Sequence, residues 1–123
     1  MKKKILDRFD KDVKGALTTL LIIGIIIEGK RVWTYQIKKR FRELSHDGGT
    51  IPDSTLYSTL NKLENDYGIL ISENDPEVQR RFFFISEEGK REFFKIKSFW
   101  FNIFHSSEKI LNGLRFDFEE SKK

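Results

Sequence analysis

The chain contains no cysteine and only two histidines, and these absences exclude several kinds of site. Without cysteine there is no disulfide framework, no thiolate nucleophile and no cysteine-based zinc site, which fits a reducing environment. His46 and His105 lie far apart in the sequence and outside any recognisable ligand motif. The sequence therefore predicts neither a metal site nor a cofactor.

No hydrophobic run is long enough to cross a bilayer. The most apolar stretch, residues 16–27, contains threonine and glycine and falls short of the roughly 20 residues that a spanning helix needs. The basic start of the chain is compatible with a signal peptide, but acidic residues within 7–12 separate it from the apolar run and no small-residue cleavage site follows. We therefore expect a cytoplasmic protein without a membrane partner.

The composition that remains is sufficient for one folded domain. The 123 residues are 38% hydrophobic and 34% charged, which supplies a core and argues against disorder. The net charge of +4 permits a nucleic-acid partner without requiring one. The distribution of the charge along the chain is therefore more informative than its sum.

Hydrophobic periodicity and turn residues predict the order helix, helix, helix, hairpin, helix. The first helix is apolar on almost every side, with Asp12 as its predicted N-cap and Gly29 as its stop. The β-branched run at residues 20–27 leaves a strand as the competing interpretation, but the length of the segment favours a helix. The predicted elements are helices over residues 12–28, 33–44 and 52–67, strands over 69–72 and 81–85, and a helix over 86–114.

This order predicts an α+β fold, mostly α: a winged helix-turn-helix of three helices and a two-stranded β-wing, with a long C-terminal dimerisation helix. In such a fold the third helix enters the major groove and the ribbon lies on the flanking DNA backbone. The predicted organisation is a charged N-terminal tail (1–11), a winged-helix DNA-binding domain (12–89), a C-terminal dimerisation helix (90–114) and a charged tail (115–123).

The third predicted helix carries short polar side chains opposite a stripe of leucines. Leu56, Leu60 and Leu63 share one face, and hydroxyl and amide groups occupy the other. Such groups can hydrogen-bond base edges, and a lysine can contact phosphate. An ordinary solvated face explains this helix alone equally well. The candidate DNA contacts of this helix are Ser54, Thr55, Ser58, Asn61 and Lys62.

Basic residues flank this helix in the sequence. From Lys30 to Arg42 the chain carries six cations and no acid, and Gln79, Arg80 and Arg81 begin the return strand of the hairpin. Cations near phosphate strengthen DNA binding in a salt-dependent way without reading the sequence. Any one of these cations alone could belong to a solvated face, but three polar or basic patches in one winged-helix frame favour DNA.

Two segments resemble a known family. Residues 54–64 read STLYSTLNKLE, and residues 80–89 read RRFFFISEEG, a wing that ends in a hydroxyl residue, two acids and a glycine. These motifs resemble the PadR family of transcriptional regulators, and the similarity extends over about residues 14–91. The resemblance implies a homodimer that binds double-stranded operator DNA, usually as a repressor. The matching segments add four candidate DNA contacts, Tyr35, Lys38, Lys39 and Tyr57.

The final predicted helix is too apolar to be covered by one surface. Its two apolar stripes lie side by side, and a monomer would expose a larger patch than soluble monomers tolerate. We expect one stripe to pack on the first helix and the other on a second copy, with their assignment left open. One stripe comprises Phe93, Trp100, Phe104 and Leu111, and the other Ile96, Phe99, Ile103, Ile110 and Leu114. The candidate dimer contacts are Ile96, Phe99, Trp100, Ile103, Phe104, Ile110 and Leu111.

The sequence thus predicts a sequence-specific DNA-binding transcriptional regulator, a repressor that binds an inverted-repeat operator as a homodimer. A winged helix used only for protein–protein contact is the alternative, because this fold serves both purposes. An enzyme has little support, since no nucleophile–base pair, phosphate loop or paired carboxylates stand out. A small-molecule effector stays open: Trp33 and Trp100 could line a pocket for one, although aromatic residues more often pack in a core or interface.

Overall fold

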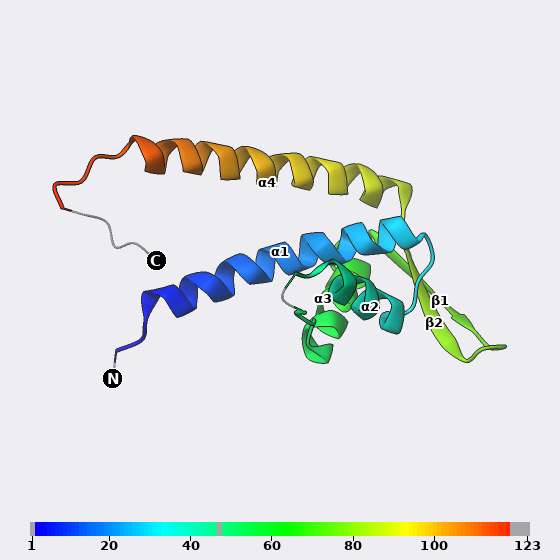
Figure 1. Ribbon diagram of the computed structural model, residues 1–123. Coiled ribbons are helices and arrows are strands. Elements are labelled where there is room, and N and C mark those ends of the chain that lie inside the picture. Colours follow the sequence, from blue (N-terminus) through cyan, green and yellow to red (C-terminus); the bar gives the residue numbers. More distant parts are fainter. Residues whose placement is uncertain (1, 47, 119–123) are drawn as a thin grey trace.

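The computed structural model describes residues 2–46 and 48–118 (Figure 1). Predictions that concern Met1, Asp47 and residues 119–123 lie outside the described residues. The elements are α1 (Ile5–Gly29), α2 (Thr34–Leu44), α3 (Asp53–Asn65), β1 (Leu70–Asp75), β2 (Arg80–Ile85) and α4 (Glu87–Gly113). The predicted order and the mostly helical α+β class are confirmed, and the strand interpretation of residues 20–27 is wrong.

Helix α1 begins at Ile5, so the prediction of a helix start at Asp12 is wrong and most of the expected tail is helical. Asp12 lies inside the helix, where its carboxylate is 3.1 Å from Arg8 Nε, and Lys14 Nζ lies 3.2 Å from Asp10 Oδ1. Both pairs are spaced by four residues, which places the partners side by side on one helix face. The charges that suggested a tail therefore support the helix.

Helix α1 ends in a tight reversal. Gly29 is the last helical residue, but the positive φ of the reversal, 69°, belongs to Lys30. A Cβ on Gly29 would overlap Val32 Cγ1, so the close approach of Val32 requires glycine at position 29. Val32 in turn exchanges two backbone hydrogen bonds, 3.0 and 2.7 Å, with Phe83 of β2. The reversal thus attaches the end of α1 to the wing.

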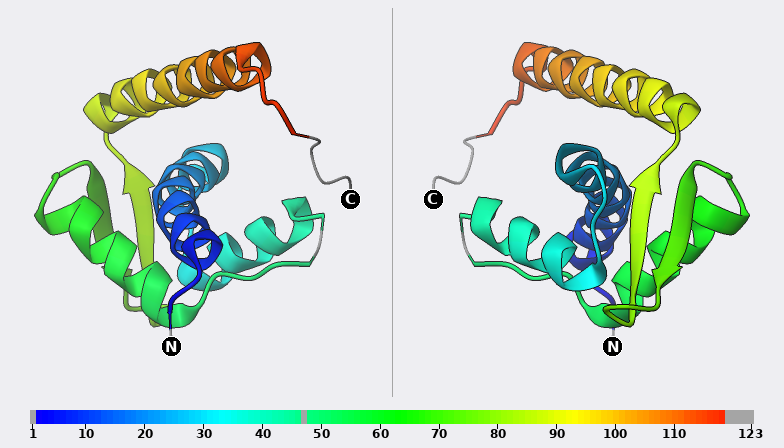
Figure 2. Two further views of the ribbon diagram at one scale, coloured as in Figure 1. Left: turned by 90° about the vertical axis from the view of Figure 1, so that its left-hand side faces the viewer. Right: turned by 90° about the vertical axis from the view of Figure 1, so that its right-hand side faces the viewer.

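The core forms around α1, which α2, α3, the hairpin and α4 surround (Figure 2). The predicted leucine stripe of α3 is buried, which confirms that face. Burial of the apolar side chains of the whole core supplies the main stabilisation of the domain. The core comprises Ile22, Ile23, Ile25, Ile26, Val32, Ile37, Ile51, Leu56, Leu60, Leu63, Leu70, Phe83 and Ile85.

Strands β1 and β2 form an antiparallel hairpin with Leu70 opposite Ile85 and Asp75 opposite Arg80. The chain then enters α4 through a well-formed N-cap, because Ser86 Oγ accepts a hydrogen bond of 3.0 Å from the Gly89 N–H. The first turn also carries two glutamates, whose negative charges stabilise the helix because they lie near the positive end of its dipole.

Helix α4 runs back along α1 on the side opposite α2 and α3 (Figures 1 and 2). The Phe93 ring of α4 packs against Gly24 of α1, where an added Cβ would lie 3.1 Å from the ring. The two helices then diverge, and every described residue from 101 to 118 is exposed. Among the described helices, none combines the length and the apolar character needed to span a membrane.

Candidate nucleic-acid interface

Helix α3 presents its polar face to solvent, as the spacing of its leucines predicts. Ser54, Ser58, Asn61 and Lys62 are exposed, and Thr55 is half-buried at the edge of the face. Part of this face borders a hollow that includes α1 residues, so it does not meet open solvent everywhere. That hollow is lined by Gly15, Thr19, Ser54, Thr55, Ser58, Thr59, Lys62, Leu63 and Tyr67.

Both candidate tyrosines are exposed. Tyr57 of α3 is 57% exposed, and Tyr35 near the start of α2 is 53% exposed, with its ring 5.4 Å from that of Trp33. Each hydroxyl can donate to or accept from a phosphate or a base. The structure therefore brings both family-implied tyrosines to the surface, on two different helices.

Lys38 is an internal contact as well as a candidate DNA contact. Its ammonium group pairs with the Asp53 carboxylate in the first turn of α3. The pair ties α2 to the start of α3, and it neutralises part of the charge that the basic stretch was expected to offer to DNA. Lys39, one position on, is exposed and forms no ion pair with another described residue.

Two further cations of the stretch from Lys30 to Arg42 have internal partners. Arg40 Nε lies 2.6 Å from Glu28 Oε1 and Nη2 lies 3.0 Å from Oε2, and this hydrogen bonding holds the pKa of the Glu28 carboxyl below its ordinary value. Arg31 Nε lies 2.8 Å from Glu73 Oε1 and its guanidinium covers the Phe82 ring. Half of the six cations are therefore paired within the chain.

The two wing arginines have different surroundings. Arg81 Nη2 donates to Ser72 Oγ at 2.6 Å and lies 3.6 Å from Glu64 Oε2 of α3. The Arg80 guanidinium instead stacks over Trp33, with Cζ 3.9 Å from the ring centroid. Adjacent residues of a strand point to opposite faces, which explains why the two side chains separate.

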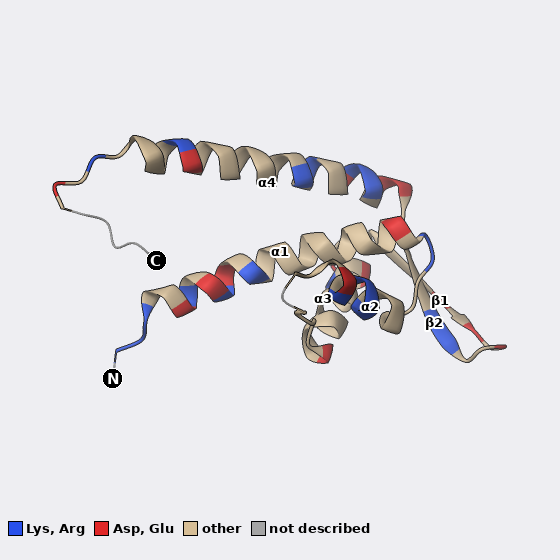
Figure 3. Cartoon of the chain, in the orientation of Figure 1, with Lys and Arg blue, Asp and Glu red and all other residues tan. Residues whose placement is uncertain are grey.

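A small hollow joins the wing to the starts of α2 and α3. Gln79, which begins the return from the hairpin tip with φ 52°, lies at its rim. The Lys and Arg residues of α2 and β2 lie on the part of the molecule away from α4 (Figure 3). The hollow is lined by Trp33, Thr34, Tyr57, Gln79, Arg80, Arg81 and Phe83.

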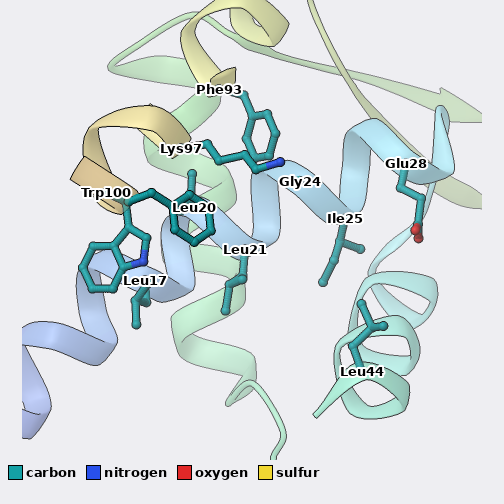
Figure 4. A pocket seen from close by; sticks show the side chains of 11 residues that line it. Leu17, Leu20, Leu21, Gly24, Ile25, Glu28, Leu44, Phe93, Lys97 and Trp100 are labelled. Atoms are coloured by element: carbon teal, nitrogen blue, oxygen red, sulfur yellow. The ribbon is translucent and has the colours of Figure 1, made fainter. Parts of the chain in front are cut away.

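The residues of the two predicted apolar stripes of α4 divide into two groups. Phe93 and Trp100 point toward α1 and, with Leu17, Leu20 and Leu21, line an apolar hollow between the helices (Figure 4). The remaining predicted contacts are exposed, so the stripe that begins with Phe93 contacts α1 only through its first half. The exposed candidates are Ile96, Phe99, Ile103, Phe104, Ile110 and Leu111.

The two tryptophans lie in different hollows, so the idea that they line one pocket is not supported. The described part of the chain contains no group of three or more histidine, aspartate or glutamate side chains placed to hold a metal ion.

Comparison with known proteins identifies the fold. No protein-family model and no curated protein sequence matches the chain. A solved transcriptional regulator from Clostridium thermocellum is 26% identical, with a TM-score of 0.69 over 85% of this chain and 96% of the other. A PadR-family transcription regulator from Clostridium difficile is also 26% identical, with a TM-score of 0.62 over 76% and 96%. A winged-helix DNA-binding protein from STIV is 25% identical, with a TM-score of 0.58 over 68% and 87%.

The chain therefore has the winged-helix fold. Its helix order, its wing and its long last helix resemble those of PadR-family transcriptional regulators, which confirms the likeness indicated by the motifs of residues 54–64 and 80–89. These three solved structures are two transcriptional regulators and a DNA-binding protein.

Proposed function

We propose that the chain is a transcriptional regulator that binds specific double-stranded DNA as a homodimer. The observation that carries the proposal is the exposed polar face of α3 beside a wing whose Arg80 borders the same hollow as Tyr57 of α3. A helix of this kind fits the major groove, while a cationic ribbon contacts the backbone beside it. The division into a DNA-binding domain up to residue 89 and a dimerisation helix from residue 90 is part of this proposal.

Selection of bound fragments from random double-stranded DNA tests the proposal. We expect one enriched inverted repeat whose half-sites are about 34 Å apart, because a two-fold dimer places its recognition helices one DNA turn apart. Binding to this repeat should weaken steeply with salt. If the chain shows no salt-sensitive DNA binding, the protein–protein alternative replaces this proposal.

We also infer repression as the sign of regulation. A dimer seated on an operator that overlaps a promoter excludes polymerase from the same DNA. A reporter gene placed behind the selected repeat should lose expression when the chain is produced, and increased expression would show activation instead. No described feature assigns an effector.

The homodimer rests on the exposed apolar side chains of α4. Phe99 is 64% exposed and Ile110 is 65% exposed, on a helix whose second half has no covering element among the described residues. Apolar patches of this extent mark interaction surfaces. A second copy presents the same patch, which closes the surface with two-fold symmetry.

Light scattering tests the dimer, since the chain mass is 14.6 kDa and a dimer has twice that mass. Replacing Phe99 and Ile103 together by aspartate should give monomers, because the charges would be buried without partners. The control replaces Ser98 and Asn102, two exposed polar residues of α4 that directly precede Phe99 and Ile103, by aspartate, and it should remain dimeric. A parent protein that scatters as a monomer contradicts the homodimer.

A further inference from the structure

We propose that Trp33 is a positioning residue for DNA binding. Its indole holds Arg80 at the small hollow that joins the wing to the starts of α2 and α3. Arg80, rather than Arg81, is then the wing arginine that binds a DNA phosphate. This inference rests on the proposed function. It assigns different roles to two adjacent arginines that the sequence analysis gives as equivalent candidate DNA contacts.

The stack leaves Arg80 available to a ligand. Its Cζ lies 3.9 Å from the centroid of the Trp33 ring, within the range of a cation–π contact. Stacking uses the flat face of the guanidinium, so the N–H donors at its edge remain free for a phosphate. Within residues 2–46 and 48–118, Arg80 forms no ion pair, and its side chain is exposed.

The indole is held by a backbone that is fixed on both sides. The Trp33 N–H donates to Gln36 Oε1 at 3.1 Å, and its carbonyl accepts from the Gln36 and Ile37 N–H groups at 2.9 and 3.2 Å. Val32, the preceding residue, is bridged to Phe83 in the wing. Trp33 therefore keeps its place relative to both α2 and the strand that carries Arg80.

The hollow beside Arg80 is also lined by other hydrogen-bond donors. Thr34, Tyr57 and Gln79 line it, and each carries a hydroxyl or an amide that can bind a phosphate oxygen. Tyr57 comes from α3, so a phosphate bound here lies directly beside the recognition helix. The site thus fits the DNA backbone that flanks the groove occupied by α3.

Arg81 lacks this freedom. One of its terminal nitrogens donates to Ser72 and lies near the Glu64 carboxylate, which connects the wing to α3 and offsets the charge. An arginine already bound to a carboxylate releases fewer counterions from DNA. Arg81 therefore provides a control of equal formal charge one residue away.

The experiment measures the affinity for the selected DNA repeat between about 50 and 200 mM salt. Arg80→Gln should weaken binding and reduce the slope of log affinity against log salt by about 0.9, the value for one phosphate contact. Arg81→Gln should leave that slope unchanged. Trp33→Ala should weaken binding about two- to five-fold, the equivalent of an exposed cation–π contact, and Trp33→Phe should restore most of the loss.

The pair of residues should act as a unit. In the Arg80→Gln background, Trp33→Ala should cause no further loss of affinity, because the positioned group is already absent. If the losses of DNA affinity caused by Trp33→Ala and Arg80→Gln multiply in the double variant, Trp33 does not act through Arg80. If the slope of log affinity against log salt falls with Arg81→Gln but not with Arg80→Gln, the choice of arginine is wrong. If the parent protein shows no salt-dependent DNA binding, the proposed function itself is wrong. Failure of the proposed function is therefore distinguishable from failure of the positioning role alone.

A measurement without DNA covers the case in which Trp33→Ala does not fold. In a Trp100→Phe protein, Trp33 is the remaining tryptophan, and its emission reports directly on the stacked guanidinium. Arg80→Gln should change this emission and Arg81→Gln should not. Equal emission from all three proteins would show that the stack does not exist in solution.

Discussion

Gly89 provides a direct test of how the wing packs against α4. It is buried in the first turn of α4, and its N–H donates to the capping Ser86 hydroxyl. A Cβ at this position would lie 2.6 Å from Ile85 Cγ2, 2.9 Å from Ile69 Cβ and 3.1 Å from the Ile69 carbonyl oxygen. The same carbonyl accepts the Ser86 N–H at 3.0 Å, so the backbone has little room to withdraw.

Two opposing effects set the result of Gly89→Ala. Alanine favours the helix over glycine by about 1 kcal/mol. Overpacking typically costs about 1–3 kcal/mol, and a displaced first turn also weakens an N-cap worth about 1 kcal/mol. We therefore expect a net loss of roughly 1–2 kcal/mol in the free energy of unfolding.

Urea unfolding followed by circular dichroism, at one fixed protein concentration, measures this loss. Gly15→Ala is the matched control, because Gly15 also lies in a helix and a Cβ added there would meet nothing within 4 Å. The control should gain up to about 1 kcal/mol from helix propensity. The packing argument is refuted if Gly89→Ala is as stable as the parent while Gly15→Ala behaves as expected.

Two further predictions concern the DNA-binding face and an ion pair. Asn61→Ala should relax the base preference in the selection experiment by about 1–3 kcal/mol at the contacted position; an unchanged preference would remove Asn61 from the recognition face. Because Arg40 lowers the pKa of Glu28 in the folded chain, the pair stabilises the fold above the unfolded pKa. Glu28→Gln should therefore lower stability at pH 7, and urea unfolding at several pH values should show this difference shrinking below about pH 4.3. Glu77→Gln, which removes a wing carboxylate that has no ion pair among the described residues, should show no such convergence.

The parts of the fold that follow from local spacing were predictable. The leucines of α3 recur at helical intervals, and all three are buried, because a regular helix turns equally spaced residues to one side. The wing was predictable for a similar reason, since a β-prone run, a polar tip and a second β-prone run can pair only as a hairpin at this distance.

The pairing of the charges was not predictable, because the partners come from distant elements. Arg31 meets Glu73 in β1, and Arg40 meets Glu28 in α1, although neither acid lies within the basic stretch. Arg81 of β2 likewise lies 3.6 Å from Glu64, an acid that α3 supplies. Counting cations along a chain overestimates the charge that is free for DNA when the fold supplies acids from elsewhere.

The exposed half of α4 has a consequence for stability. The helix has 27 residues, about 40 Å, but only its first part packs on α1. A helix that lacks tertiary packing is marginal in water, so a second copy should contribute to its stability. We therefore expect the melting temperature of the parent to rise over a roughly hundredfold increase in protein concentration, as for a folded state coupled to association. The variant with aspartate in place of Phe99 and Ile103 should melt lower and without concentration dependence. A parent melting temperature that stays constant across this range would show that α4 is stable without a partner.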